Sequence, residues 1–158
     1  NISRRFIGHL QSNKVNKCLE MFDTIDSVDS LKLAKKISSA ALRLGKRINV
    51  LLEINTSGEP QKHGLLPNQL EEIQLCFEEK NIFINGLMTV GPRTTDLKKI
   101  RESFIQLRDL RDTINESNTQ ANMRELSMGM SGDYEIAVEE GATMVRLGSA
   151  LFGERQTL

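Results

Sequence analysis

Two short Gly/Ser-rich segments near the end of the chain hold the residues best suited to chemistry. They cover residues 126–133 (LSMGMSGD) and residues 144–149 (MVRLGS). Turns of this composition offer backbone N–H groups and hydroxyls to a phosphate, and the start of a following helix favours negative charge. Arg146 ends the apolar run of the second segment, where a bound ring could meet it. The pattern predicts a site for a small phosphorylated cofactor; the alternative is two ordinary loops with tight glycine turns.

Two further residues could contribute to such a site. Lys62 lies in a long polar loop, residues 56–64, which follows the most apolar run of the chain. Loops in that position carry function in barrels, and this lysine could meet a carboxylate, a phosphate or an aldehyde. Solvated surface lysines are the common alternative. Met88 ends another apolar run, and its thioether could pack on a ligand ring or fill the core.

Other catalytic or metal-binding arrangements find no support in the sequence. It has no G-x-S-x-G elbow, no Walker loop and no G-x-G-x-x-G after the first strand. His9 could act as a general acid or base, but nothing in the sequence pairs it with a carboxylate. His9 and His63 add no cluster, and Cys18 and Cys76 lack metal-site spacing. We expect no metal site, and both cysteines to be reduced thiols.

The composition is that of one soluble domain, and we treat residues 1–158 as such. The 21 Lys+Arg residues balance the 21 Asp+Glu residues, which argues against a nucleic-acid binder that relies on basic charge. No apolar run is long enough for a transmembrane helix or a signal peptide. The sequence therefore predicts no membrane association and a cytoplasmic location.

Strand-like and helix-like patterns alternate along the chain. The expected strands are residues 5–8, 22–27, 48–55, 84–90, 125–128 and 144–147. Amphipathic helices are expected between them and after the last, over about residues 13–21, 31–44, 67–77, 97–114, 133–140 and 149–155. Asn13 and Asp96 are expected helix caps, and Gly45 and Gly141 are expected stops.

This alternation predicts a parallel α/β fold. An open doubly wound sheet and a (β/α)8 barrel both fit. Glycine or a small polar residue follows nearly every strand, which suits a barrel whose strand ends converge on a site. Six β/α units are two short of a closed barrel.

Six stretches, taken together and in order, resemble the pyridoxal 5'-phosphate (PLP) homeostasis protein family, which is related in fold to the N-terminal barrel of alanine racemase. They are residues 6–14 (FIGHLQSNK), 26–30 (DSVDS), 54–59 (INTSGE) with Lys62 and Gly64, 86–91 (GLMTVG), 126–131 (LSMGMS), and 145–149 (VRLGS) with 152–155 (FGER).

The resemblance implies a (β/α)8 TIM-type barrel with PLP at the carboxyl ends of the strands. It implies that hydroxyls and backbone N–H groups hold the phosphate, that an arginine faces the pyridine nitrogen, and that methionines and an asparagine line the site. With the loop lysine added, the candidate cofactor-binding residues are Ser127, Ser131, Arg146, Gly148, Ser149, Met88, Asn55, Met128 and Lys62.

Two departures from the family accompany the match. The family's Schiff-base lysine lies on the first barrel strand, ahead of Asn1. The chain is therefore expected to be the C-terminal three-quarters of a barrel, without about the first two β/α units, which agrees with the six units counted above. The family also has Trp-His before Phe-Ile-Gly, whereas this chain has Arg4 and Arg5.

The family is thought to carry and buffer PLP rather than to catalyse a dedicated reaction, so we expect no catalytic residues here. The expected partners are PLP and PLP-requiring apo-enzymes, and the complete protein is expected to be a monomer. One alternative is a PLP-dependent racemase or lyase, but racemisation needs two acid/base groups and Tyr134 is the single tyrosine. A PLP-independent phosphosugar-binding barrel is the other alternative.

Overall fold

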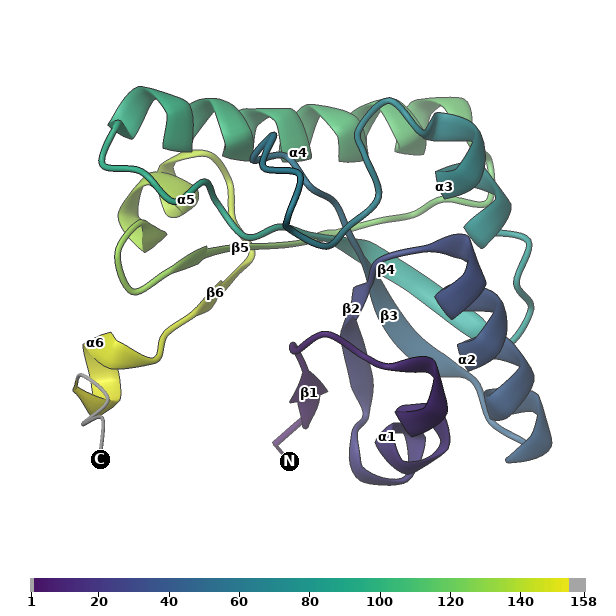
Figure 1. The fold of residues 1–158 in the computed structure, drawn as a ribbon. Coiled ribbons are helices and arrows are strands. Elements are labelled where there is room, and N and C mark those ends of the chain that lie inside the picture. Colours follow the sequence, from purple (N-terminus) through teal and green to yellow (C-terminus); the bar gives the residue numbers. More distant parts are fainter. Residues whose placement is uncertain (1, 154–158) are drawn as a thin grey trace.

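The computed structural model describes residues 2–153, which form an open, six-stranded parallel sheet (Figure 1). The strands follow one another across the sheet in chain order, β1 to β6. Every neighbouring pair is parallel. The strands are β1 (Arg5–Phe6), β2 (Thr24–Val28), β3 (Ile48–Glu53), β4 (Ile82–Met88), β5 (Glu125–Met130) and β6 (Met144–Arg146).

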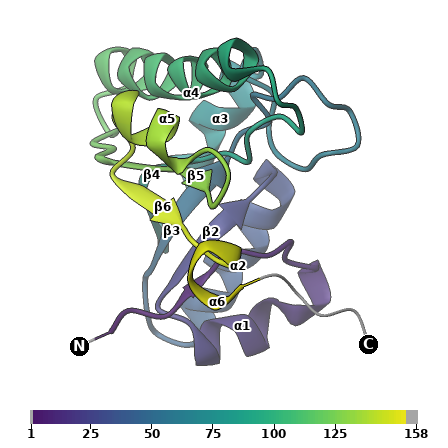
Figure 2. The same cartoon turned by 90° about the vertical axis from the view of Figure 1, so that its left-hand side faces the viewer.

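The helices from α1 to α5 connect the strands and lie on the convex face of the sheet, whereas α6 follows β6 and lies apart from them (Figures 1 and 2). This placement follows from the strand order, because successive right-handed crossovers between parallel neighbours all return over the same face. The result is an open half-barrel. The helical elements are η1 (Ser12–Lys14), α1 (Val15–Met21), α2 (Leu31–Arg43), α3 (Leu70–Cys76), α4 (Leu97–Ser117), α5 (Tyr134–Glu139) and α6 (Ser149–Phe152).

Local sequence signals set the ends of the two longer helices. The Ser30 hydroxyl accepts the Leu33 N–H at the start of α2, and Gly45 takes a positive φ of 62° just after its end. The Asp96 carboxylate accepts the Lys98 and Lys99 N–H groups at the start of α4, as predicted. Asn13, however, caps nothing: it lies inside η1, whose N-cap position is Gln11.

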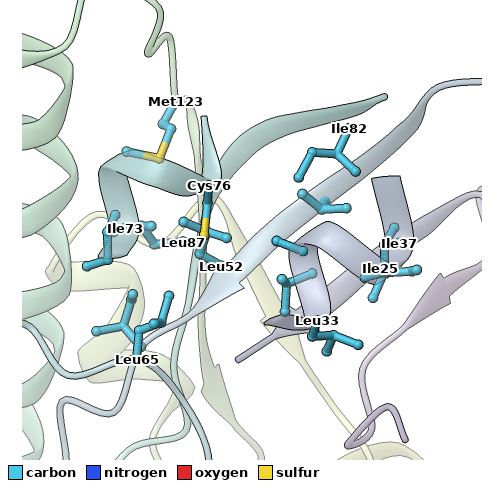
Figure 3. Packing of buried hydrophobic residues seen from close by; sticks show 14 of the residues in the cluster. Ile25, Leu33, Ile37, Leu52, Leu65, Ile73, Cys76, Ile82, Leu87 and Met123 are labelled. Carbon is cyan, nitrogen blue, oxygen red and sulfur yellow. The ribbon is translucent and has the colours of Figure 1, made fainter. Parts of the chain in front are cut away.

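The helix-facing side of the sheet is apolar and forms the core. Ile25, Leu52 and Leu87 come from three adjacent strands and are fully buried against α2 and α3 (Figure 3). Side chains of a strand alternate between its two faces, and in β3 every second residue belongs to this layer. Phe104 and Leu107 of α4 continue the layer over β4 and β5. This layer joins the strands and helices into one body.

β4 and β5 approach each other so closely at one point that only glycine fits. A Cβ added to Gly86 would lie 1.9 Å from the Glu125 carbonyl oxygen, well inside van der Waals contact. Gly129, with φ of 91°, similarly leaves room for α5, because its Cβ would lie 2.6 Å from that of Ala137. Gly86 thus lets β4 pair closely with the start of β5, and Gly129 lets α5 pack against the end of β5.

The structure adjusts several expected boundaries. β1 covers residues 5–6 rather than 5–8, and α3 begins at Leu70 rather than in the turn at Pro67. Within residues 2–153, β1 and β6 are the two edges of an open parallel sheet of six strands, in agreement with the six β/α units expected. The predicted helix at 149–155 is described as far as Gly153; its last two residues lie outside the described part. No helix in that part is long and apolar enough to cross a membrane.

Candidate functional site

Arg146, at the end of β6, is held by neutral acceptors from two neighbouring strand ends. Its Nη1 donates to both the carbonyl oxygen and the Oγ of Ser127, each at 2.8 Å. Its Nη2 donates to the carbonyl oxygen of Thr89 at 2.7 Å. These partners fix the plane of the guanidinium without neutralising its charge, and arginine has further N–H donors besides these. Glu139, an acidic residue near Arg146 in sequence, binds Arg101 instead.

Acidic side chains surround the partly buried guanidinium of Arg146. Burial lowers the pKa of the Arg146 guanidinium, and the charges of Asp26, Glu53 and Asp133 oppose that effect. Burial raises the pKa of the Glu53 carboxyl, and the nearby charge of Asp29 raises it further. The concave face of the sheet is therefore a place where charges interact strongly, because little water screens them.

Ser131 and the start of α6 form a second polar centre close in sequence to Arg146. The Ser131 Oγ accepts the N–H of Gly148 at 3.2 Å and the N–H of Ala150 at 3.1 Å. Two backbone donors thus converge on one exposed oxygen position. Ser149, between them, is exposed at the first position of α6. A phosphate oxygen accepts from the same kind of donors, and a phosphate site at residues 131, 148 and 149 stays a prediction.

Buried hydroxyls behind Arg146 anchor the ends of β3 and β4, and the sequence offered no expectation for them. The Thr56 Oγ1 lies 2.9 Å from the Thr89 Oγ1 and 2.7 Å from the Ser103 Oγ. The Thr89 hydroxyl also donates to the carbonyl oxygen of Ile54. This network fixes the backbone at Thr89, whose carbonyl holds Arg146. In the sequence, each of these threonines simply follows an apolar strand. No spacing rule distinguishes such a threonine from one at the surface.

Asn55 and Lys62 are both engaged within the loop after β3. The Asn55 amide donates to the Glu59 carbonyl oxygen at 2.9 Å, and its oxygen accepts the Ser57 hydroxyl at 2.8 Å. Lys62 Nζ donates to the carbonyl oxygen of Gly91 at 2.6 Å and pairs with the Glu59 carboxylate at 3.0 Å. In this conformation both side chains shape the loop.

The two candidate methionines lie on different sides of the sheet. Met88 is buried but outside the helix-facing core cluster, as Leu51 of the neighbouring strand is. Met128 belongs to that cluster. The structure therefore brings Met88, Ser127 and Arg146 to the concave side, whereas Met128 packs with the core.

Arg5, one of the two residues that depart from the expected family motif, crosses the concave face. Its guanidinium binds both oxygens of Asp26 at 2.8 and 3.0 Å and donates to Glu125 Oε2 at 2.7 Å. It thereby links β1 and β2 to β5. Arg4 instead pairs with Asp23 at the surface, at 3.2 Å. The two consecutive arginines thus have quite different surroundings.

The structure corrects the expectation that the two histidines form no cluster. The imidazoles of His9 and His63 stack, with ring centroids 3.9 Å apart and planes inclined by 12°. Both face Asp29, which follows β2. The loops after β1, β2 and β3 bring these residues together, and sequence separation alone could not show it. The expectation for the cysteines is confirmed: Cys18 and Cys76 are free and buried.

Comparison with known proteins shows which family the chain belongs to. Residues 4–156 match the family described as "Alanine racemase, N-terminal domain". The chain is 40% identical to a pyridoxal phosphate homeostasis protein of Synechocystis over 158 residues, covering 98% of this chain and 71% of that protein. The chain belongs to the pyridoxal phosphate homeostasis proteins of the alanine racemase N-terminal domain family.

Other members of the pyridoxal phosphate homeostasis family are longer than this chain. The Aquifex aeolicus and human members are 41% and 43% identical to it, and their matches cover 96% and 98% of this chain. The chain spans 66% and 59% of their lengths.

Solved structures agree with the family assignment. PipY of Synechococcus elongatus, whose structure has PLP bound, is 35% identical with a TM-score of 0.86, covering 94% of this chain and 69% of that one. Alanine racemase of Clostridium difficile is 19% identical with a TM-score of 0.83, covering 99% of this chain and 41% of that one, which shows a shared fold.

Proposed function

We propose that this chain holds PLP at the carboxyl ends of β4–β6, and that the whole protein carries and buffers the cofactor. The observation that carries this proposal is the pairing of two centres. Backbone N–H groups converge at Ser131, and the half-buried, charged Arg146 lies on the strand that leads to them. A phosphate and a ring acceptor are what these two centres would bind. The PLP-bound PipY structure, at 35% identity, supports the same ligand.

Each residue has a role in this proposal that follows from its contacts. Ser131, Gly148 and Ser149 donate to the phosphate. Ser127 orients Arg146, and the Arg146 guanidinium donates to the pyridine nitrogen. Met88 provides apolar contact on the concave face. Asn55 shapes the loop beside the site through its bonds to Glu59 and Ser57, and we give no direct contact to Met128.

The same contacts favour retention over catalysis. When bound, PLP supplies an aldehyde and a ring that can accept electrons. Arg146 keeps its own proton, because arginine does not lose its charge in proteins, so it leaves the ring nitrogen unprotonated and weakens the ring as an electron sink. The homologues carry homeostasis names rather than enzyme names. We therefore propose a carrier without a dedicated reaction, which delivers PLP to apo-enzymes.

We further propose that two more β/α units complete a (β/α)8 barrel in the full-length, monomeric, cytoplasmic protein. Family members exceed this chain in length, and β1 and β6 are open edges within the described residues. Lys62 would have to leave Gly91 and Glu59 before it could reach an aldehyde. A lysine of the added units is thus the better candidate for covalent attachment.

Two alternatives are tested by simple assays. For a racemase, the Tyr134 hydroxyl is the obvious second base, but it donates to the adjacent Glu135 at 3.3 Å. Absence of racemised alanine after incubation with the PLP-loaded full-length protein is the expected result.

For a phosphosugar-binding barrel, sugar phosphates would displace PLP; we expect that they do not, because Arg146 has no partner in a sugar ring.

The decisive experiment measures PLP binding by the full-length protein and its Arg146→Met and Ser131→Ala variants, by absorbance after dialysis. A charge-assisted hydrogen bond contributes about 1.5–3 kcal/mol, so Arg146→Met should weaken retention by at least about tenfold. Ser131→Ala should weaken PLP retention too, but leave the binding of pyridoxal, which has no phosphate, unchanged.

Arg43→Met and Ser39→Ala, both exposed on α2, are the matched controls and should bind PLP as the wild type does. Circular dichroism checks that each variant is folded. Unchanged PLP retention in both site variants would refute the site, and equal loss of pyridoxal in Ser131→Ala would refute its role at the phosphate.

A further inference from the structure

His9, Asp29 and His63 come together at the rim of the sheet, where β1, β2 and β3 end. His9 follows β1, Asp29 follows β2 and His63 lies in the loop after β3. The His9 Nδ1 is 3.2 Å from Asp29 Oδ2, and the His63 Nδ1 is 3.9 Å from the same oxygen. One potential ligand atom of each residue lies within 4.8 Å of those of the other two. Three consecutive strand-to-helix loops thus contribute one donor each.

Asp29 is the fixed member of this group. Its side chain is 14% exposed, and its other oxygen, Oδ1, accepts the Ser30 hydroxyl at 3.1 Å. Ser30 is itself held at the N-cap of α2. A carboxylate oriented through one oxygen by such a bond presents the other oxygen in a defined direction, as ligating carboxylates do in metal sites. Oδ2 points to both imidazoles.

The two histidines are the adjustable members. Their side chains are 44% and 55% exposed, which leaves the rings room to rotate. Bonds to a metal of about 2.0–2.2 Å place neighbouring tetrahedral ligand atoms roughly 3.3 Å apart. The His9 to Asp29 distance already meets this value. His63 needs to approach by less than 1 Å, roughly, which a side-chain rotation can supply.

We propose that His9, Asp29 and His63 bind a late first-row divalent cation such as Zn²⁺. Two imidazole nitrogens and one carboxylate oxygen suit Zn²⁺, Cu²⁺ or Ni²⁺, whereas Mg²⁺ and Ca²⁺ prefer oxygen ligands alone. With three protein ligands, a tetrahedral cation keeps one position for water or another ligand. The site is separate from the proposed PLP contacts and uses none of them.

The test is calorimetric titration of ZnCl₂ into the chelator-treated full-length protein. We expect one saturable Zn²⁺ site. His9→Gln, His63→Gln and Asp29→Asn should each weaken Zn²⁺ binding by at least about tenfold, since each removes one of three ligands. The double variant H9Q/H63Q should show no saturable binding. Mg²⁺ in excess should not compete. Visible absorption bands of bound Co²⁺ should disappear in the same variants.

Asp109→Asn removes an exposed carboxylate from α4 and is the control; it should leave Zn²⁺ affinity unchanged. Circular dichroism establishes that the variants fold. PLP retention, measured in parallel, should be the same in His9→Gln and His63→Gln as in the wild type. A wild-type protein without a saturable site, or affinity that survives in H9Q/H63Q, would overturn the proposal, whatever the outcome for PLP.

Discussion

The two faces of the half-barrel differ in what they bury. On the convex face, Ile25, Leu52 and Leu87 belong to an apolar cluster and are fully buried. On the concave face, the same strands bury Asp26, and burial raises the pKa of its carboxyl although Arg5 hydrogen-bonds to it. Strands whose side chains alternate between two faces can therefore stabilise the fold on one side and hold charges on the other.

This difference separates stability from binding within single strands. An apolar side chain contributes by leaving water, and its partners need only fit in shape and volume. A buried charge costs free energy unless it is paired, so it persists where its partner is fixed. On the concave face that condition is met by Arg5 with Asp26 and Glu125, and by Arg146 with the ends of β4 and β5.

The largest effect is expected on the convex face. Phe104 is fully buried at the centre of α4, so Phe104→Ala should lower the free energy of unfolding by about 3–5 kcal/mol. Urea denaturation of the full-length protein measures it. Leu97→Ala, at the 66% exposed start of the same helix, is the control and should change stability by no more than about 0.5 kcal/mol. Similar losses in both variants would contradict the assignment of the core.

A smaller effect is expected from the concave face. Arg5→Met would leave the fully buried Asp26 carboxylate without its partner. Removing one member of a buried pair costs about 3–5 kcal/mol, and because Arg5 is 22% exposed we expect about 2–3 kcal/mol. Arg4→Met, one residue away in an exposed pair with Asp23, should cost about 0–1 kcal/mol.

The double variant R5M/D26N separates charge from packing. If the cost of Arg5→Met comes from an unpaired buried charge, neutralising Asp26 should restore much of the lost stability in urea denaturation. Equal instability of the single and double variants would mean that the Arg5 side chain acts through its packing alone.

The apolar face was the part that the sequence could predict. The run from Ile48 to Glu53 indicated a parallel strand, and Asp96 and Gly45 marked helix ends, because these features act over a few neighbouring residues. The six expected strands all appear, with ends shifted by at most two residues. The family resemblance, which the comparisons confirm, rested on motifs at the strand ends.

The concave face and its rim could not be predicted in the same way. The link from Arg5 to Glu125 joins residues 120 positions apart, and the His9–His63 stack depends on two loops meeting. Arg146 could be predicted as a site residue because it lies in a recognisable motif. Its hydrogen-bond partner at Thr89 could not, because the acceptor is a backbone carbonyl oxygen, which every residue type has. Long-range polar contacts follow from the curvature of the sheet, which no local pattern specifies.

A third group of charges lies between α4 and the end of α5, and its contribution to stability depends on pH. The Glu140 carboxylate binds Arg101 and Arg108 and so joins α5 to α4. The hydrogen bond from Arg101, followed by that from Arg108, holds the pKa of Glu140 below its ordinary value. A carboxyl whose pKa is lower when folded adds stability at neutral pH that is lost as pH falls through that lowered pKa.

Glu140→Gln should therefore lower Tm at pH 7, by at most about 2–4 °C because exposed arginines are well screened, and the difference from wild type should vanish in acid. Asp26 has the opposite shift, so its buried pair cannot produce this loss on acidification. Glu102→Gln, in an exposed pair with Lys98 on α4, is the control and should leave Tm unchanged at either pH. A Tm difference for Glu140→Gln that persists unchanged below pH 3, roughly, would show that Glu140 acts by shape rather than by charge.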